Sequence, residues 1–332
     1  MGRANVSWSV IVLFAGIVWA PLPTVAGPAC DPIAALAPFA MIGREGIRAR
    51  VSTPLPATYC AFGLWYKGPV CAPKVTFNGV ILEPFHLDRS VLVATQSTGT
   101  AIAFKDSARY ECQENDMNDD IVTGGGLIKG APDDPFFGTI DTTGTNPIVS
   151  SCTQAFVDAV DQSNAIRAMP AVLELGDVLV RQGEYLSIDV PPGGGVIRMQ
   201  SLVLQGVRSR VSSGYTYECL YSDQDGAYLE LIGSQDDEVV LDVVGKVSIG
   251  ACGAISPSSE AFLINVAGEG NAVRMGKHSY GDGVSISILA PERTIKLEGT
   301  RVPEATYVGY VWGRKIVTRG YVEMDAPTCY YF

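Results

Sequence analysis

From residue 172 onward, short apolar runs alternate with turns that contain glycine. The glycines that close similar segments lie 23, 44, 26, 23 and 21 residues apart, so the longest gap spans two periods. Each unit, for example 262–276 or 286–299, holds two apolar strands and a glycine turn. A fixed period of this length is typical of repeat architectures. The glycines are Gly183, Gly206, Gly250, Gly276, Gly299 and Gly320.

A unit this short cannot bury both of its faces alone, so we expect the units to stack. Stacking buries one continuous apolar column and pairs every backbone edge except at the two ends. We therefore predict an all-β fold, a right-handed β-solenoid with its coils in 171–332. A β-sandwich is the alternative, because two strands per repeat would mimic the period. The residues expected to point into the column are Val244, Ile249, Val266, Ile288, Leu297, Val311 and Val317.

One α-helix is predicted over 151–170, flanking the coils. Ser151 and Gln154 form a capping box, in which each side chain satisfies a free backbone N–H of the first turn. Pro170 ends the helix, because its ring cannot continue the hydrogen-bond ladder. Apolar residues at helical spacing give the helix a face that packs on the core. They are Ala155, Phe156, Ala159, Val160 and Ile166.

The N-terminus has the pattern of a signal peptide over 1–26. Arg3 precedes an apolar run over 10–20, and cleavage is expected near Ala26. The run is too short for a membrane span, and no second run follows, so the mature chain is expected to lack a transmembrane segment. Export would place it in the periplasm, outside the cell or on its surface. Lipidation of Cys30 stays open as an alternative anchor.

Residues 27–150 form an irregular β region that is expected to contribute to the solenoid. All eight cysteines follow the predicted cleavage point, and an even number in an exported chain indicates disulfides. Zinc is disfavoured, because there is no C-x-x-C pair and only two histidines, His86 and His278. Proximity favours Cys60–Cys71, Cys112–Cys152 and Cys219–Cys252, which leaves Cys30–Cys329 to join the two ends, although 105 pairings are possible. The cysteines are Cys30, Cys60, Cys71, Cys112, Cys152, Cys219, Cys252 and Cys329.

Charge and composition narrow the function classes. The chain is 47% hydrophobic and 18% charged, which is typical of a globular protein. Its net charge is −11 and its pI about 4.7. An acidic surface repels phosphate backbones and anionic lipids, so nucleic-acid binding is not expected.

The run 262–320 resembles the last coils of the secreted bacterial ice-binding-protein-like β-solenoids and related surface proteins. The segments that carry the likeness are 265–268 (Asn-Val-Ala-Gly), 288–291 (Ile-Leu-Ala-Pro) and 313–317 (Gly-Arg-Lys-Ile-Val). The resemblance implies a helix alongside the coils. It also implies a β-helix that is discontinuous in sequence, because an N-terminal segment supplies further coils. Residues 37–51 are placed to start that segment.

The family's best-known activity is ice binding, which relies on flat faces with repeated Thr-x-Thr rows. Here the segments 98–100 and 143–145, each Thr-Gly-Thr, are isolated. Charged residues take outward positions in the last coils, and charges on an ice face would keep their own hydration shells. These residues are Lys296, Glu298, Arg314 and Arg319.

Acidic clusters could serve a metal or an enzyme. Asp116, Asn118 and Asp120 have the alternating spacing of a calcium loop, but Ile121 stands where an EF-hand needs glycine. Calcium is therefore the one cofactor that the sequence suggests. The pair Asp223 and Asp225 and the run 236–238 are the other acidic candidates, and they read as solvated turns.

No catalytic residue is predicted. The chain is expected to be a secreted or cell-surface structural or adhesive protein that binds a surface polymer, a protein partner or itself. The alternatives are a carbohydrate-active β-helix enzyme, a lyase or hydrolase, and in third place an ice-binding protein. A cluster of carboxylates in a groove would favour the enzyme, and a flat Thr-rich face would favour ice binding.

Overall fold

The computed structural model describes residues 39–50, 63–66, 69–79, 81–84, 91–106, 108–110, 120–130, 138–206, 226–233, 239–256, 262–276, 280–281, 286–299, 306–320 and 322–324. The predicted signal peptide lies outside these residues. Among the described residues, strands predominate and α1 (Pro147–Ala168) is the single helix. No described helix has the length and hydropathy needed to cross a membrane.

The strands form three sheets, and the described strands pair in parallel throughout. This rules out the β-sandwich alternative, whose sheets are antiparallel. The 16-stranded sheet contains β1 (Met41–Arg50), β3 (Val70–Ala72), β4 (Val75–Asn78), β6 (Val91–Ala94), β7 (Thr100–Lys105), β9 (Asp120–Thr123), β10 (Leu127–Lys129), β11 (Ile140–Asp141), β12 (Ala171–Val180), β14 (Gly195–Leu204), β16 (Val239–Val243), β17 (Val247–Ile249), β19 (Phe262–Asn265), β20 (Val273–Met275), β22 (Ile286–Glu298) and β24 (Val311–Arg319).

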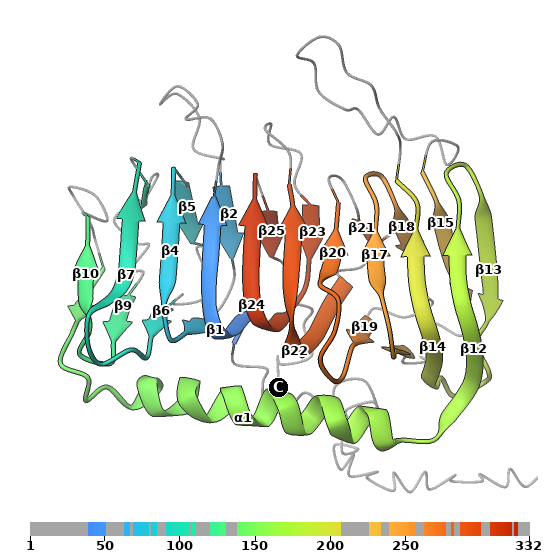
Figure 1. Cartoon of the computed structure of the whole chain (residues 1–332), viewed down its shortest axis with the longest axis horizontal. Coiled ribbons are helices and arrows are strands. Elements are labelled where there is room, and N and C mark those ends of the chain that lie inside the picture. Colours follow the sequence, from blue (N-terminus) through green and yellow to red (C-terminus); the bar gives the residue numbers. More distant parts are fainter. Residues whose placement is uncertain are drawn as a thin grey trace, which may run out of the picture.

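Two smaller sheets lie behind the large one in Figure 1. The four-stranded sheet contains β13 (Tyr185–Asp189), β15 (Tyr228–Ile232), β18 (Ala254–Ser256) and β21 (Tyr280–Gly281). The five-stranded sheet contains β23 (Thr306–Val308), β25 (Val322–Met324), β2 (Gly63–Tyr66), β5 (Ile81–Pro84) and β8 (Arg109–Tyr110). Stacked parallel strands of this kind make the fold β-helix-like.

The order of strands in the stack differs from their order in the chain. The N-terminal strand β1 lies between the C-terminal strand β24 on one side and β3 and β4 on the other. The β-helix is therefore discontinuous in sequence, and β1 coincides with the start expected at 37–51. We call the boundary between β1 and β24 the seam. Figure 1 shows it near the middle of the stack, where blue meets red.

The long strands turn a corner and so divide the large sheet into two faces. The first half of β22 pairs with β19 and its second half with β20, and the register of β22 against β24 shifts between Ala290 and Thr294. Strand β1 shows the same shift between Gly43 and Gly46. One face of the sheet lies over α1, and the other is the front of Figure 1.

The core is the predicted apolar column, with two corrections. Ile249, Val266, Ile288, Leu297 and Val311 are buried, as expected. Val317 is only partly buried, because Ile316 takes the inward position of β24 and Val317 pairs with two outward residues, Lys296 and Arg48. Val244 is also only partly buried, because it lies in the turn after β16 and Val243 points inward instead.

The periodic glycines mark a place where backbones touch. A Cβ built on Gly250 would lie 2.1 Å from the backbone nitrogen of Gly206. A Cβ on Gly276 would lie 2.6 Å from the backbone nitrogen of Ala251. Successive turns therefore stack backbone on backbone at this corner, and glycine is required there. This contact explains part of the period that the sequence displays.

The helix α1 begins four residues earlier than predicted. Asn146 is its N-cap, and the Asn146 Oδ1 atom accepts a hydrogen bond from the backbone N–H of Ile148 at 3.1 Å. Pro147 occupies the first helical position, where its fixed φ suits the helix. The predicted capping box is therefore wrong: Ser151 lies inside the helix and donates to the carbonyl of Pro147. The predicted end is confirmed, since the last helical residue is Ala168.

The helix runs along the stack and covers one face of the large sheet (Figure 1). Its buried residues form a stripe at helical spacing: Cys152, Ala155, Ala159, Ser163 and Ile166. They pack on outward apolar side chains of the sheet, including Ile42, Leu289 and Trp312. Outward positions that would otherwise be polar are apolar here because α1 removes them from water.

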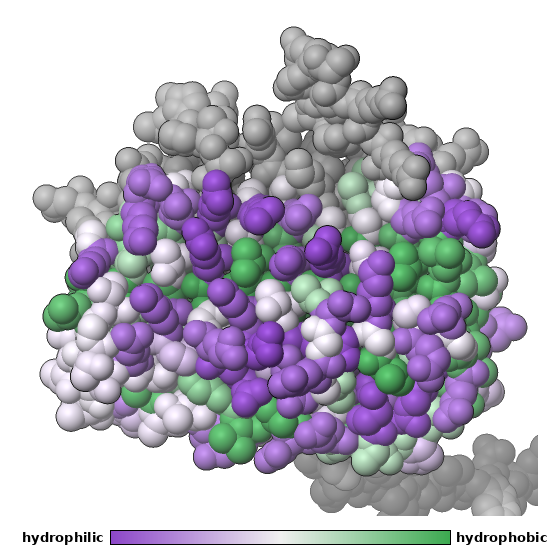
Figure 2. Space-filling model, viewed as in Figure 1, coloured by the Kyte–Doolittle hydropathy of each residue, from purple (hydrophilic) through white to green (hydrophobic). Residues whose placement is uncertain are grey.

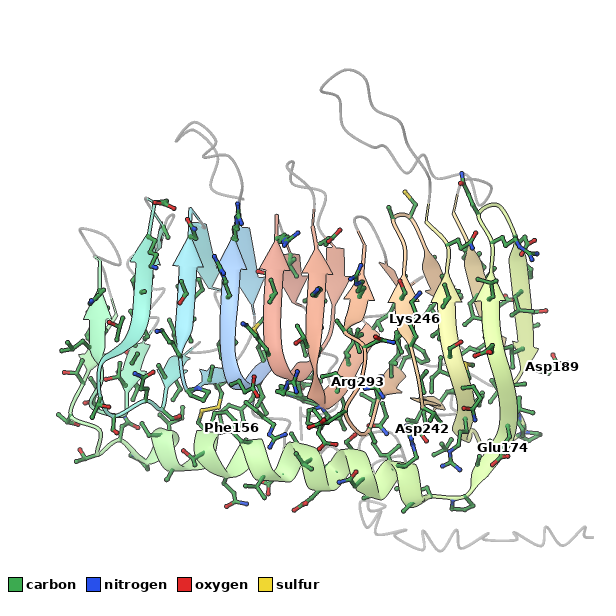
Figure 3. The ribbon with its side chains drawn as sticks, in the orientation of Figure 1. Phe156, Glu174, Asp189, Asp242, Lys246 and Arg293 are labelled. Atoms are coloured by element: carbon green, nitrogen blue, oxygen red, sulfur yellow. A yellow bond between two sulfur atoms is a disulfide. The ribbon has the colours of Figure 1, made fainter. Side chains whose placement is uncertain are left out.

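A disulfide joins α1 to the sheet, and it corrects the predicted pairing. Cys71 on β3 is bonded to Cys152 on α1, with their Cα atoms 5.7 Å apart. The bond lies near Phe156 in Figure 3. The predicted pairs Cys60–Cys71 and Cys112–Cys152 are therefore wrong. Proximity in sequence predicted the wrong partners, because the β-helix brings Cys152 of α1 over a strand whose cysteine lies 81 residues earlier in the chain.

The other predicted disulfides fall partly outside the described residues. Cys252 is disulfide-bonded, but the predicted pair Cys219–Cys252 includes Cys219, which lies outside them. Cys30, Cys60, Cys112 and Cys329 lie outside them as well. No described cysteine is free.

A charged network anchors the C-terminal end of α1. Asp242 is fully buried, and its carboxylate accepts hydrogen bonds from Arg167 on α1 and from Arg198 on β14, the shortest at 2.6 and 2.9 Å. Asn265 donates to the same carboxylate and accepts from the hydroxyl of Ser163. Figure 3 places Asp242 just above the helix. Each member is satisfied, so the network fixes α1 in register with the coils.

A buried cation, Arg293, holds the corner of the sheet. The Arg293 guanidinium donates to the carbonyl oxygens of Val244 at 2.7 Å and Gly268 at 2.9 Å, and also to that of Gly245. Burial lowers the pKa of Arg293, and the positive charge of Arg167 acts in the same direction. Arg293 therefore links the turns of successive coils through their carbonyl oxygens.

Candidate binding face

The front of the large sheet is one of the described surfaces that α1 leaves uncovered. It consists of β10, β7, β4, β20 and the second halves of β1, β24 and β22, followed by β17, β14 and β12 (Figure 1). Side chains alternate along each strand. On β1, for example, Ile47 and Ala49 are buried, whereas Arg48 and Arg50 are exposed. A similar alternation on β4, β20, β22 and β24 gives the front of the sheet outward rows that cross the strands, although on β7 Ala103 is buried.

Two such rows follow directly from the strand register. The first row contains Arg274, Lys296, Val317, Arg48, Thr76, Ala103 and Lys129. The second contains Glu298, Arg319, Arg50, Asn78 and Lys105. Neighbouring strands lie about 4.8 Å apart, so this is also the spacing of the positions within a row.

Most charged residues of these rows are cations. Together with Lys315 at the start of the same face on β24, and Lys74 just before β4, they make up what we call the basic face. Glu298 is the single acidic residue of the two rows, and the same strands carry two further acidic residues near the corner, Glu45 on β1 and Glu292 on β22. The basic face comprises Arg48, Arg50, Lys74, Lys105, Lys129, Arg274, Lys296, Lys315 and Arg319.

The basic face is positively charged, although the chain as a whole is acidic. The whole protein has 35 acidic and 24 Lys or Arg residues. Ion pairs do not explain the gathering, because no cation of the basic face forms a salt bridge with another described residue. All are exposed except Lys296, which is partly buried. The cations of the basic face are therefore not held in ion pairs with described residues.

The strongest local concentration is at the seam. Arg50 on β1 lies directly opposite Arg319 on β24, and Arg48 lies one row away on β1. Like charges in opposed positions repel each other and destabilise a sheet. Asn78 flanks Arg50 on one side and Glu298 flanks Arg319 on the other. Three of the four arginines of the basic face thus lie where the N-terminal strand meets the C-terminal one.

The basic face has a boundary toward β12. There the outward row continues as Ser248, Val203 and Leu179, with Leu179 47% exposed. Figure 2 shows hydrophilic side chains over the middle of the front and a hydrophobic area toward β12. The cations therefore form a patch on this side of the molecule rather than a uniform coating.

The predicted calcium residues are only partly described. Asp120 begins β9, and its Oδ1 atom accepts hydrogen bonds from the backbone N–H of Thr139, at 3.0 Å, and from the Thr139 hydroxyl. Asp116 and Asn118 lie outside the described residues. Within the described residues, no group of three acidic, Cys or His side chains is placed to hold a metal ion. Calcium binding stays a prediction.

The two Thr-Gly-Thr segments do not build a threonine row. Thr143 and Thr145 precede α1, where the Thr143 hydroxyl donates to Asp141 at 2.6 Å. Hydrogen bonds from the Thr143 side chain and backbone, and from Asn146, lower the pKa of Asp141. Thr100 begins β7 and pairs with Leu127 on β10, an exposed apolar residue. The threonines therefore serve a turn and a strand end.

The remaining acidic candidates, Asp223, Asp225 and the run 236–238, lie outside the described residues.

The structure also shows an aromatic pair that the sequence did not predict. Tyr185 on β13 and Tyr228 on β15 stack with ring centroids 5.3 Å apart, and the Tyr185 hydroxyl donates to Glu230. That hydrogen bond raises the pKa of Tyr185. The pair lies on the four-stranded sheet, away from the basic face.

The sequence located only two of the nine residues of the basic face. It assigned Lys296 and Arg319 to outward positions of the last coils, as the structure has them. It missed Arg48, Arg50 and Lys105, because only the pairing of β1 with β24 brings the N-terminal strands beside them. The available signal was the alternation Ile-Arg-Ala-Arg over 47–50, which is typical of a strand with one face in water.

Comparisons with known proteins found likeness in structure alone. No known sequence family and no curated protein matches the chain. An ice-binding protein from the Antarctic ascomycete Antarctomyces psychrotrophicus is similar over 89% of this chain and 97% of its own, with a TM-score of 0.38 and 14% identity. An ice-binding protein from an Arctic yeast has a TM-score of 0.40 and 12% identity, covering 86% of this chain and 90% of its own. An ice-binding protein from an Antarctic biological consortium has a TM-score of 0.41 and 10% identity, covering 86% of this chain and 86% of its own.

Proposed function

We propose that this chain is an exported, right-handed β-solenoid whose basic face binds an anionic polymer at or near the cell surface. The observation that carries the proposal is the basic face itself: exposed cations without described ion-pair partners, gathered on one sheet of a chain with net charge −11. The function is structural or adhesive, and the polymer is bound without being cleaved.

A polymer suits this surface better than a small anion. A single exposed Lys or Arg attracts an anion weakly, because both are hydrated and salt screens the charge. A polyanion presents many charges on one chain, so each contact raises the effective concentration of the next. It also releases its condensed counterions when the cations replace them. The acidic remainder of the protein repels the same polymer, which orients binding toward the basic face.

The two alternatives find less support in the described residues. Ice binding needs a flat face with regular, uncharged positions, and here charged side chains occupy both outward rows. A lyase or hydrolase needs a positioned acid and base or a metal. Asp242, the carboxylate that is most enclosed, is occupied by two arginines.

Export and surface placement are part of the proposal. The predicted signal peptide supports them, as does the disulfide between Cys71 and Cys152, since disulfides persist in oxidising compartments. The right-handed sense is supported by the general rule that parallel β crossovers are right-handed.

The test is binding of the purified, full mature protein to a panel of immobilised polymers. The panel contains polygalacturonate, a sulfated glycan, neutral dextran, duplex DNA and vesicles with anionic lipid. We expect anionic glycans to bind and dextran not to bind. Replacing Lys105 and Lys129 with Glu should weaken binding, whereas Arg181→Glu, in the turn after β12, should not. Equal binding to dextran, or no binding to any polyanion, would contradict the proposal.

A further inference from the structure

We infer that the seam holds a carboxylate-selective subsite, in which Arg50 and Arg319 bind successive acidic sugars of a polyuronate chain that crosses the strands, and Arg48, one row away on β1, supplies a further guanidinium beside them. The inference rests on the proposed function and specifies its ligand. It concerns which cations discriminate between polyanions, and not only whether the face attracts them.

The first argument is the kind of cation at the seam. Arginine and lysine are not interchangeable, because the guanidinium is a rigid planar fork that binds a carboxylate through two parallel hydrogen bonds. On the basic face, arginine occupies the seam at Arg48, Arg50 and Arg319. Apart from Arg274 on β20, the cations farther from these three positions are lysines, such as Lys105 and Lys129. Three of the four cations that the basic face has on β1 and β24 are thus arginines, the fourth being Lys315, and lysines make up most of the charge around them.

The second argument is the opposed pair. Arg50 and Arg319 face each other across neighbouring strands, where like charges destabilise the sheet. The backbone N–H of Gly320 donates to the carbonyl of Arg50, so the two strands are held together directly beside this pair. An anion that accepts hydrogen bonds from both guanidinium groups would remove the repulsion. Glu298 already flanks Arg319 from β22, whereas Arg50 is flanked by the uncharged Asn78, so the carboxylate of a ligand would act mainly beside Arg50.

The third argument is spacing and shape. Within a row, positions recur at about the 4.8 Å separation of strands. A polyuronate carries one carboxylate on every sugar ring, and a ring spans a similar distance, so a chain along the stack can meet one strand per sugar. Duplex DNA is a cylinder and would touch a flat sheet along a narrow line. A membrane would make no distinction between arginine and lysine rows. The geometry therefore favours an extended acidic glycan.

The polymer would also connect the two ends of the polypeptide. β1 belongs to the N-terminal part and β24 to the C-terminal part, and their pairing closes the stack at the seam. A ligand that binds Arg50 and Arg319 together binds only the closed seam. Linkage then requires that the ligand raise the thermal stability of the protein.

The experiment compares two double variants with the same change in charge. The variant Arg50→Gln/Arg319→Gln removes two guanidinium groups from the seam. The variant Lys105→Gln/Lys129→Gln removes two positive charges from the part of the basic face farther from the seam. Affinity for galacturonate hexamers is measured by calorimetry, with methyl-esterified hexamers as the uncharged control. We expect a loss of about tenfold or more for the arginine variant, because hydrogen bonds to charged groups are lost, and a smaller loss for the lysine variant. Arg50→Lys/Arg319→Lys, which keeps the charge, should lose most of the affinity as well.

Several results would overturn the inference. Equal losses in the arginine and lysine variants, or full affinity in the lysine-for-arginine variant, would show general charge attraction and leave the proposed function intact. Tighter binding of sulfated glycan, DNA or anionic vesicles than of polyuronate would assign the seam to another ligand. Failure of all polyanions to bind would overturn both proposals. The melting temperature of each ligand-free variant, expected at or above that of the parent, controls for folding.

Discussion

Cys152 of α1 is bonded to Cys71 of β3, so a single covalent link fixes the N-terminal half of the helix to a strand 81 residues earlier. Both residues are fully buried in the apolar layer between α1 and the sheet. The link and the Asp242 network lie toward opposite ends of the helix (Figure 3). The helix is thus held at two places, one covalent and one ionic, and each can be tested separately.

Replacing Cys71 and Cys152 together with Ala should lower the free energy of unfolding by about 2–4 kcal/mol, since the crosslink restricts a long loop in the unfolded chain. Urea unfolding of the parent and variant under non-reducing conditions measures the difference. Peptide mapping of the parent should recover the two cysteines in one linked fragment. A fragment that joins Cys60 to Cys71 would contradict the pairing.

Removing the carboxylate of Asp242 should be more damaging than removing an exposed one. Asp242→Ala leaves Arg167 and Arg198 without their common partner in a buried site, which costs about 3–5 kcal/mol. Glu174 is the matched control, because its side chain is 74% exposed and lies 3.7 Å from Arg198. Glu174→Ala should change stability by less than about 1 kcal/mol. Similar losses in both variants would show that the network is not specific.

The observed start of α1 gives a third prediction. Asn146→Ala removes the side chain that accepts from Ile148 and should cost about 1 kcal/mol. Ser151→Ala, at the predicted but incorrect cap, should change stability by less than about half of that, since an exposed substitution within a helix has small effects. Thermal unfolding of the two variants decides between the two helix starts. A larger loss of stability in Ser151→Ala than in Asn146→Ala would contradict the observed helix start and support the predicted capping box.

The sequence could predict the parts of this fold that depend on local pattern. Strand alternation and the glycine period indicated stacked strands, and Pro170 correctly ended the helix. The helix start was missed because Ser151 with Gln154 imitates a cap, although Asn146 and Pro147 form a stronger one. The arrangement at the seam could not be predicted, because the contact of Arg50 with β24 is nonlocal and no sequence pattern records the register.

Two adjacent residues of β24 test the register on which the basic face depends. Ile316 is fully buried and Val317 points outward between Lys296 and Arg48. Ile316→Ala should cost about 2–5 kcal/mol, as other large-to-small core substitutions do. Val317→Ala should cost less than about 1 kcal/mol. The reverse order would shift β24 by one residue and turn Arg319 inward, so the basic face would no longer exist.

The salt dependence of polymer binding distinguishes a charged surface from an apolar or sugar-stacking one. If the basic face replaces counterions on a polyanion, the logarithm of the association constant falls linearly with the logarithm of salt concentration. Lys105→Gln/Lys129→Gln removes two exposed charges that the described residues leave unpaired, so the slope should become shallower by about two. Arg181→Gln should leave the slope unchanged, because Arg181 lies beyond β12 and pairs with Glu184 at 3.3 Å. Binding that does not respond to salt between low and physiological concentration would mean that the cations take no part. The polymer would then have to be recognised elsewhere, for example at the stacked pair of Tyr185 and Tyr228.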